Sequence, residues 1–599
     1  MTAIITPING DASKYARSTR TSKFTADDVI RAQQSLRLMP ILDRLTQWQE
    51  QDNGSGGRKA DLSFEALLVA MLLLRPENAP QLMTEVANIF YQRLTPEAAQ
   101  LLGIAHIRPA DTHVQNWRRW YNRTTRCMQR FLELLEPWPA RRQVMNAAER
   151  AYETAKQDET LSLIKRARLD WVCNALLEMT FRELPVEVQA QWKGDISVDQ
   201  TKVPAVSKRG RAKLNRKAGQ REVKNEPDSL VMEMEADWYN HAPEFRGRDD
   251  KKARAFTWGY AANFAVMIPP DPTGIHDAAL PHPLLAIGMK LSTPIKDLVA
   301  HDTVQVLQSL QERGHPAGRI TGDKEYFAQQ LPENLLFPAQ ALGYYPVTDY
   351  RTPQLGLNGN IGGAIQVEGQ CYCPMMKKGL INASVEHNAG AIDDETYEAR
   401  IEKQRPLYQV HRKGLPKPDG TYAIQCPALG LSPSVTCSIR DLHPDAAKKS
   451  RPHVTAPAEH LRDRICTQTS VKVVPDDTTR YLQPLRYGSA EWKRVYGFDR
   501  ATIERMNSIV KDRGKENLEN TAIRLTRGFA AAAVFTALTL VSANRRQTAA
   551  WVRKNAEREV LDLRPRKKSF TPISLDNYRP RGPMLNPDGT ITLPGDLAS

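Results

Sequence analysis

The sequence predicts a multidomain α/β protein, because helical and strand patterns occupy separate blocks of the chain. At 599 residues, the chain exceeds what one hydrophobic core usually supports. Apolar residues recur every three or four positions up to about residue 190, strand-like runs begin near residue 195, and a Gly- and Pro-rich interval precedes the last helices. This order predicts a helical N-terminal domain, a core of helices packed on a mixed sheet, and an insertion that interrupts that core.

We expect residues 1–23 to be a flexible N-terminus and residues 24–190 to form the helical domain. Runs such as SFEALLVAMLLL and PQLMTEVANIFYQRL carry the helical period. The segment from Trp117 to Arg130 interleaves Arg with Trp and Tyr, which suits a helix lying against DNA phosphates. An ordinary amphipathic helix explains this pattern equally well.

The first part of the core is predicted at residues 191–350. The runs DISVDQTKVPAV, TWGYAANFAVMIP and PLLAIGMKLS read as three strands, LVAHDTVQVLQSLQERG as a helix, and GRITGD and GYYPVTDY as two more strands. Between the first two strands, Lys208 to Lys224 carries eight Lys or Arg against one Glu and lacks apolar periodicity. This basic loop is either a solubilising surface loop or a phosphate-binding segment, for which the candidates are Lys208, Arg209, Arg211, Lys213, Arg216 and Lys217.

Residues 351–490 break the α/β pattern with Gly, Pro and short strand-like runs, which predicts a β-rich insertion domain. Cys371, Cys373, Cys426, Cys437 and Cys466 fall in or beside this interval. A structural Zn²⁺ needs about four tetrahedral ligands, but the spacing does not match a zinc ribbon. A zinc site and buried reduced thiols therefore remain alternatives.

The second part of the core, residues 491–560, begins with a helix that contains DRATIERMNSIVKDR and continues with an Ala-rich helix. The uncharged run 528–543 is short for a bilayer span, so we expect a buried helix and no membrane association. Residues 561–599 are rich in Pro, Gly and charge, which predicts a disordered tail.

Composition and charge favour a polyanionic partner. Lys and Arg total 83 against 68 Asp and Glu, a net charge of +15. The first residues lack a basic segment followed by an apolar one, and the odd number of cysteines, seven, argues against a disulfide framework. These features predict a cytoplasmic protein with reduced thiols.

Three carboxylates are the candidate catalytic groups. Asp199 lies inside the first predicted strand and Asp323 ends the fourth, so both can meet where an open sheet binds ligands. On the later helix, Glu504 shares one face with Arg500, Asn507 and Lys511, because steps of three, four and seven return to the same side. Such a stripe is most often a solvated surface.

If that helix packs on the sheet, Asp199, Asp323 and Glu504 would form an oxygen-rich site for two Mg²⁺ ions, with Mn²⁺ able to substitute. A metal pair of this kind can activate a water or 3′-hydroxyl and stabilise the leaving oxygen of a phosphodiester. Arg500 and Lys511 would then hold phosphates nearby.

The segments SVDQTKVP, ITGDKEYF and YGFDRATIERMNSIVK resemble the DDE transposases of bacterial insertion sequences, in the group with a Y-R-E-K signature. Arg500, Glu504 and Lys511 fit the signature's spacing, whereas Tyr496 stands one residue too far from Arg500. VEGQCYCP and RLTRGFAAAAVF are also similar to this group, and the likeness covers roughly residues 190–550.

The resemblance implies an RNase H-like catalytic core of the retroviral integrase superfamily and an end-binding role for the helical domain. It implies Mg²⁺-dependent cleavage at the terminal inverted repeats of a transposon, followed by strand transfer into target DNA. Asp199, Asp323 and Glu504 would be the metal ligands, and Arg500, Lys511, Asn507 and Tyr496 would lie against DNA. The enzyme would act as a homodimer or higher assembly on double-stranded DNA, associated with a bacterial nucleoid. An inactive DNA-binding relative and a structure-selective nuclease are the alternatives.

Overall fold

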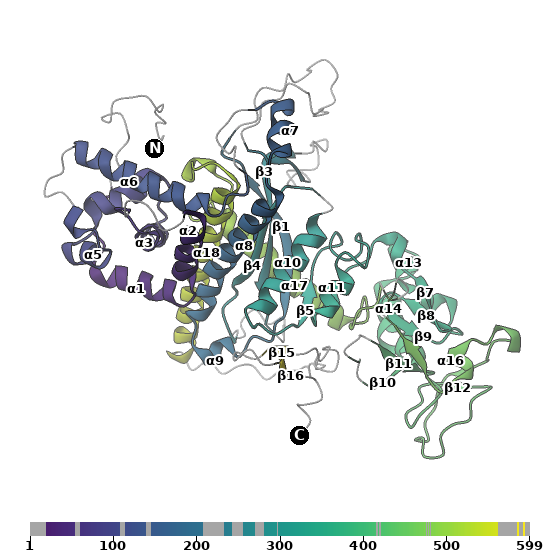
Figure 1. Ribbon diagram of the computed structural model, residues 1–599. Coiled ribbons are helices and arrows are strands. Elements are labelled where there is room, and N and C mark those ends of the chain that lie inside the picture. Colours follow the sequence, from purple (N-terminus) through teal and green to yellow (C-terminus); the bar gives the residue numbers. More distant parts are fainter. Residues whose placement is uncertain are drawn as a thin grey trace.

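The computed structural model describes most of the chain between residues 20 and 592. The described residues are 20–53, 60–107, 114–138, 145–207, 233–241, 255–269, 281–295, 298–414, 417, 421–474, 476, 479, 481–560, 584–585 and 591–592. Within them the chain is an α/β protein built on a mixed sheet, as predicted. Figure 1 shows the N-terminal helices to the left of this sheet and a separate lobe at the far right.

The N-terminal stretch is helical, as its period predicted. Its α-helices are α1 (Ala26–Arg37), α2 (Ile41–Asn53), α3 (Phe64–Leu74), α4 (Met83–Asn88), α5 (Pro96–Leu101), α6 (Val114–Glu133), α7 (Ala147–Ala155), α8 (Glu159–Arg182) and α9 (Val186–Gln189). Helix α1 begins with a capping box between Thr25 and Asp28. Trp117 and Trp120 of α6 are buried, with exposed fractions of 2% and 0%, so the aromatic face of this helix packs into the protein core.

The central sheet contains six strands. They are β1 (Ile196–Pro204), β2 (Asp237–His241), β3 (Ala255–Met267), β4 (Ala286–Ser292), β5 (Arg319–Thr321) and β6 (Tyr345–Val347). Strand β1 runs antiparallel to β3 and parallel to β5; β5 is parallel to β6, and both β2 and β4 pair antiparallel with β3. The five predicted strands are present, whereas β2 was not predicted.

Helices cover both faces of the sheet. Helix α10 (Leu298–Glu312) packs on the face that carries Ile196 and Val198. On the opposite face, α17 (Ala490–Lys511) and α18 (Phe529–Val560) share one continuous core with the N-terminal helices and with β3 and β4. Asn544 of α18 ties that helix to the sheet edge, because its side chain accepts a hydrogen bond from the Ala286 N–H and donates one to the Ala286 carbonyl. Within the described part of the chain, every helix is too short or too polar to cross a membrane.

Residues 351–490 form the lobe at the right of Figure 1, which has its own core. Its strands are β7 (Leu357–Ile361), β8 (Ala364–Val367), β9 (Gln370–Tyr372), β10 (His411–Lys413), β11 (Tyr422–Gln425), β12 (Thr436–Cys437), β13 (His453–Val454) and β14 (Val471–Val473). The prediction of a β-rich unit missed the short helices α12 (Lys378–Ile381), α13 (Ala383–Asn388), α14 (Asp394–Glu398), α15 (Arg405–Tyr408) and α16 (Arg464–Thr467). Helices α12, α13 and α16 have four to six residues, too few for a recognisable period, whereas α14, the π-helix Ala399–Gln404 and α15 form one continuous helical run whose period the π turns shift.

Helix α11 (Leu336–Ala341) precedes β6. Residues 1–19 of the predicted flexible N-terminus, the basic loop and most of the predicted disordered tail lie outside the described residues, whereas Ser22 is described and accepts hydrogen bonds from Arg93. In the tail, the backbone of β15 (Met584–Leu585) pairs antiparallel with β16 (Ile591–Thr592).

Candidate active site

Asp199 lies on the central strand, on the face that α17 covers. Strand side chains alternate between faces, and the neighbouring Val198 packs into the core beneath α10. The Asp199 side chain, which is 17% exposed, therefore points to the opposite face, where Ile503 and Met506 of α17 are buried. The strand-borne carboxylate and the helix predicted to face it are thus brought together.

Asp323 follows the strand that runs parallel to β1. Ser197 pairs with Thr321, so Asp199 and Asp323 each lie two residues beyond an aligned pair. Neighbouring strands are about 4.8 Å apart, which brings the two residues near each other, and the charge of Asp323 raises the pKa of Asp199. Asp323 accepts a hydrogen bond from the Glu325 N–H at 2.8 Å, which holds the turn after β5.

Arg500 lies between two of the predicted carboxylates. Its Nη1 is 3.8 Å from Asp199 Oδ1, and its Nη2 is 3.3 Å from Glu504 Oε1. The Glu504 side chain is 63% exposed, so this carboxylate reaches the site from the solvent side. Arg500 and Glu504 lie four residues apart, as the helical spacing required.

Asn507 fixes the other oxygen of Asp199. Its Nδ2 donates a hydrogen bond to Asp199 Oδ2 at 2.8 Å, although the two residues are 308 positions apart in the chain. Asn507 is 9% exposed, and its Oδ1 is buried and has no hydrogen-bond partner among the described residues. The structure thus places Asn507 on the helix face that carries Arg500, beside Asp199.

The electrostatics show that the three carboxylates influence one another. Burial, together with the charges of Asp323 and Glu504, raises the pKa of Asp199 to about 6, although Arg500 opposes this shift. Burial alone would lower the pKa of Arg500, but Asp199, Asp323 and Glu504 outweigh it and raise the pKa. The site therefore has an excess of negative charge, which one arginine only partly compensates.

The other predicted contact residues have different surroundings. Lys511 lies 3.8 Å from Glu519, which also pairs with Lys202 at 3.4 Å, so Lys511 belongs to a cluster at the far end of α17. Tyr496 stacks on Trp492 with ring centroids 4.9 Å apart and is half-buried. Burial and the nearby Asp349 raise the pKa of Tyr496, which keeps its hydroxyl neutral.

A buried ion network holds α17 in place against the end of β5. This network was not predicted from the sequence. The Arg319 guanidinium donates to Asp499 at 2.8 and 3.0 Å and also pairs with Asp195. Thr321 donates a further hydrogen bond to Asp499 at 2.8 Å, and Arg319 and Asp499 are both fully buried. Since Asp499 directly precedes Arg500, this network helps to hold Arg500 and Asn507 beside Asp199. The signal in the sequence that could have revealed this network was Asp499, an aspartate on the apolar face of the predicted helix.

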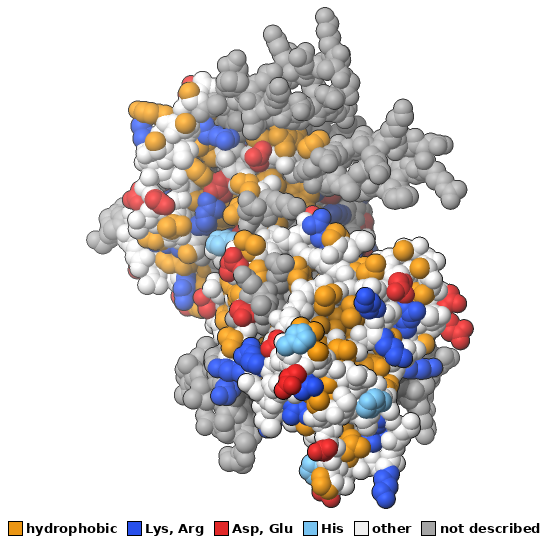
Figure 2. Space-filling view, turned by 90° about the vertical axis from the view of Figure 1, so that its right-hand side faces the viewer, with side chains coloured by type: hydrophobic (Ala, Val, Ile, Leu, Met, Phe, Trp, Pro, Cys, Tyr) orange, Lys and Arg blue, Asp and Glu red, His pale blue; other side chains and the backbone are white. Residues whose placement is uncertain are grey.

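The predicted basic loop, with Lys208, Arg209, Arg211, Lys213, Arg216 and Lys217, lies outside the described residues. Figure 2 shows acidic and basic side chains interspersed over the face of the inserted lobe that it presents. That face has no continuous single-sign patch, so it offers no separate indication of a polyanion surface.

The donor chemistry of the site suits a hard divalent cation. Its donors are the carboxylate oxygens of Asp199, Asp323 and Glu504 and the unpartnered amide oxygen of Asn507, and Mg²⁺ prefers such oxygen ligands. The raised pKa of Asp199 reflects buried negative charge that a cation would neutralise. The possible ligands are not already arranged around a metal position. The described residues contain no group of three His, Cys, Asp or Glu side chains positioned to hold a metal ion.

Compared with known proteins, the chain matches no family model, no curated protein and no solved structure.

Proposed function

We propose that this chain is a DDE transposase that cleaves DNA at transposon terminal inverted repeats and joins the freed 3′ end to target DNA. The observation that carries the proposal is the packing of α17 over β1, where Arg500 and Asn507 contact Asp199 and the charges of Asp323 and Glu504 raise its pKa. A mixed sheet whose central strand has one antiparallel and one parallel neighbour supports an RNase H-like core. The interval 351–490, with its own core, would be the insertion before the Glu helix.

In this proposal Asp199, Asp323 and Glu504 hold two Mg²⁺ ions, with Mn²⁺ as a substitute, and Asn507 keeps Asp199 oriented. When bound, the ions would activate the attacking water or 3′-hydroxyl and stabilise the leaving oxygen. Arg500, whose guanidinium stays charged, would exchange its carboxylate partners for a phosphate oxygen of the DNA. Lys511 and Lys202, which both pair with Glu519, would supply further phosphate contacts at the C-terminal end of α17.

The decisive test is Mg²⁺-dependent cleavage of labelled DNA that carries the gene's own flanking sequences. Wild-type protein is compared with Glu504→Gln, which removes one ligand charge and keeps the shape, and with Glu187→Gln, an exposed glutamate of α9 distant from the site. We expect wild type and Glu187→Gln to cut at the repeat boundary, and Glu504→Gln to bind the DNA without cutting it. Loss of about 10²- to 10³-fold is typical when a key electrostatic group is removed.

Equal cleavage by Glu504→Gln and wild type would refute the metal-site assignment. Cleavage that ignores the flanking sequence would favour a structure-selective nuclease, and binding without cleavage by wild type would favour an inactive DNA-binding relative. Sedimentation of the protein–DNA complex measures how many protein chains it contains. One protein chain bound to paired DNA ends would argue against the expected homodimer or higher assembly. Action on chromosomal DNA would place the protein in the cytoplasm, at a bacterial nucleoid.

A further inference from the structure

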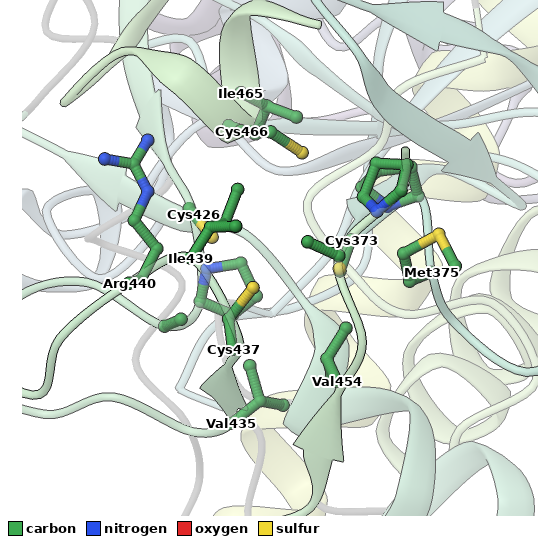
Figure 3. A pocket seen from close by; sticks show the side chains of 15 residues that line it. Cys373, Met375, Cys426, Val435, Cys437, Ile439, Arg440, Val454, Ile465 and Cys466 are labelled. Carbon is green, nitrogen blue, oxygen red and sulfur yellow. The ribbon is translucent and has the colours of Figure 1, made fainter. Parts of the chain in front are cut away.

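Four cysteines of the inserted lobe, far apart in the sequence, line one pocket. Cys373 directly follows β9, Cys426 directly follows β11, Cys437 ends β12, and Cys466 lies in α16. Figure 3 shows their sulfur atoms around the same space. Because four separate segments each contribute one thiol, sequence spacing alone could not reveal the cluster.

The two most buried thiols are held by matching turns. Cys373 and Cys426 are each followed by Pro, and in each turn the residue three positions later donates its N–H to the cysteine carbonyl at 3.0 Å. The N–H groups of Met375 and Ala428, two positions after each cysteine, lie against the thiols and lower their pKa values, although burial outweighs this and raises both. Hydrogen bonds of this kind orient sulfur ligands and stabilise thiolates in metal sites.

Cys437 also begins a turn, since the Arg440 N–H donates to the Cys437 carbonyl at 3.2 Å. The Arg440 side chain lies near Cys426 and Cys466 and favours their ionised forms, although burial still raises both pKa values. A thiolate cluster carries excess negative charge, so a nearby guanidinium is the counter-charge it needs.

The rest of the pocket is apolar. Apart from the thiols and Arg440, its lining side chains are those of Pro, Ala, Met and aliphatic residues such as Val435, Ile439, Val454 and Ile465. Burial and the three neighbouring thiols raise the pKa of Cys373 to about 12, so without a cation the group stays neutral. A pocket lined by thiols and apolar side chains suits a metal that prefers sulfur ligands. It does not suit Mg²⁺, which needs oxygen donors.

The strand pairing at this place is short. Strand β12 pairs with β13, and each has two residues. A pair this short is not stable by itself. The thiols would connect β9, β11, β12 and α16 at one point, and metal binding at such a place contributes directly to folding.

We propose that Cys373, Cys426, Cys437 and Cys466 bind one structural Zn²⁺ that closes the inserted lobe. Among the described residues, the four thiols are not close enough together to coordinate a metal ion as they stand. Zinc binding would therefore move the sulfur atoms inward and release the thiol protons. The four cysteines are free in this structure, and their arrangement does not rely on a disulfide. This site is independent of the proposed catalytic carboxylates.

The test measures the zinc content of the full-length protein, purified with zinc and then freed of loosely bound metal. We expect about one zinc per chain in wild type and a loss of about tenfold or more in Cys426→Ser and Cys466→Ser. Cys371→Ser is the matched control, because Cys371 is buried two residues from Cys373 but does not line the pocket. This control should keep its zinc.

Replacing zinc with Co²⁺ in the wild-type protein avoids dependence on the folding of the variants. We expect an intense near-ultraviolet thiolate-to-cobalt absorption and the visible bands of a tetrahedral site. A wild-type protein without stoichiometric zinc and without these bands would overturn the proposal. So would full zinc content in both pocket variants, or a loss of zinc in Cys371→Ser equal to theirs. A disulfide that forms readily between pocket cysteines in zinc-loaded protein would also contradict it.

Discussion

Asp499→Asn tests whether the buried ion network sets the register of α17. The substitution removes the charge that pairs with Arg319 and keeps the side-chain shape. Arg319 and Asp499 are both fully buried, and the Arg319 guanidinium donates hydrogen bonds of 2.8 and 3.0 Å to the Asp499 carboxylate. Breaking a buried pair by removing one partner costs about 3 to 5 kcal/mol, because the remaining charge loses its compensation. Asp195 still contacts Arg319, so we expect about 3 kcal/mol, the lower end of that range.

Hydrogen exchange of peptides from α17 is the appropriate assay, because a chain of this size does not unfold as one unit. A loss of about 3 kcal/mol in the free energy of local opening corresponds to exchange about 100-fold faster. Asp394→Asn is the control, since that side chain is 99% exposed and should change exchange little. Exchange of α17 in Asp499→Asn within about threefold of the wild-type rate would refute the reasoning.

Two further predictions concern the site and the base of the inserted lobe. The folded state raises the pKa of Asp199 from 3.8 to about 6 and so favours its protonated form, which means that this group lowers stability as pH rises from about 4 to 6. In metal-free buffer, Asp199→Asn should therefore match wild type in thermal stability near pH 4 and exceed it by up to about 3 kcal/mol above pH 6.5; a difference that does not vary with pH would contradict this. Gly488, at the end of the inserted lobe, has a φ of +79°, and an added Cβ would lie 2.0 Å from the Tyr397 hydroxyl. Gly488→Ala should therefore make this end of the lobe sensitive to limited proteolysis. Gly497→Ala is the control and should not, because an added Cβ there meets no neighbouring atom.

The sequence determined the local structure around the candidate site. The strand that carries Asp199 and the strand before Asp323 were predicted from short β-branched and apolar runs, because strand propensity is a local property. The shared face of Arg500 and Glu504 followed from helical geometry alone. The signal failed for β2 and for the short helices of the inserted lobe, which contain too few residues for a period to emerge.

Only the tertiary structure decided which residues meet. Asn507 contacts Asp199, Arg319 joins Asp195 to Asp499, and four cysteines from separate segments surround one pocket. These contacts depend on strand register and on the packing of α17, and each joins positions far apart in the chain. A periodic pattern shows which side chains share a face of an element, but it does not show which other element covers that face. That choice comes from burying the whole core at once.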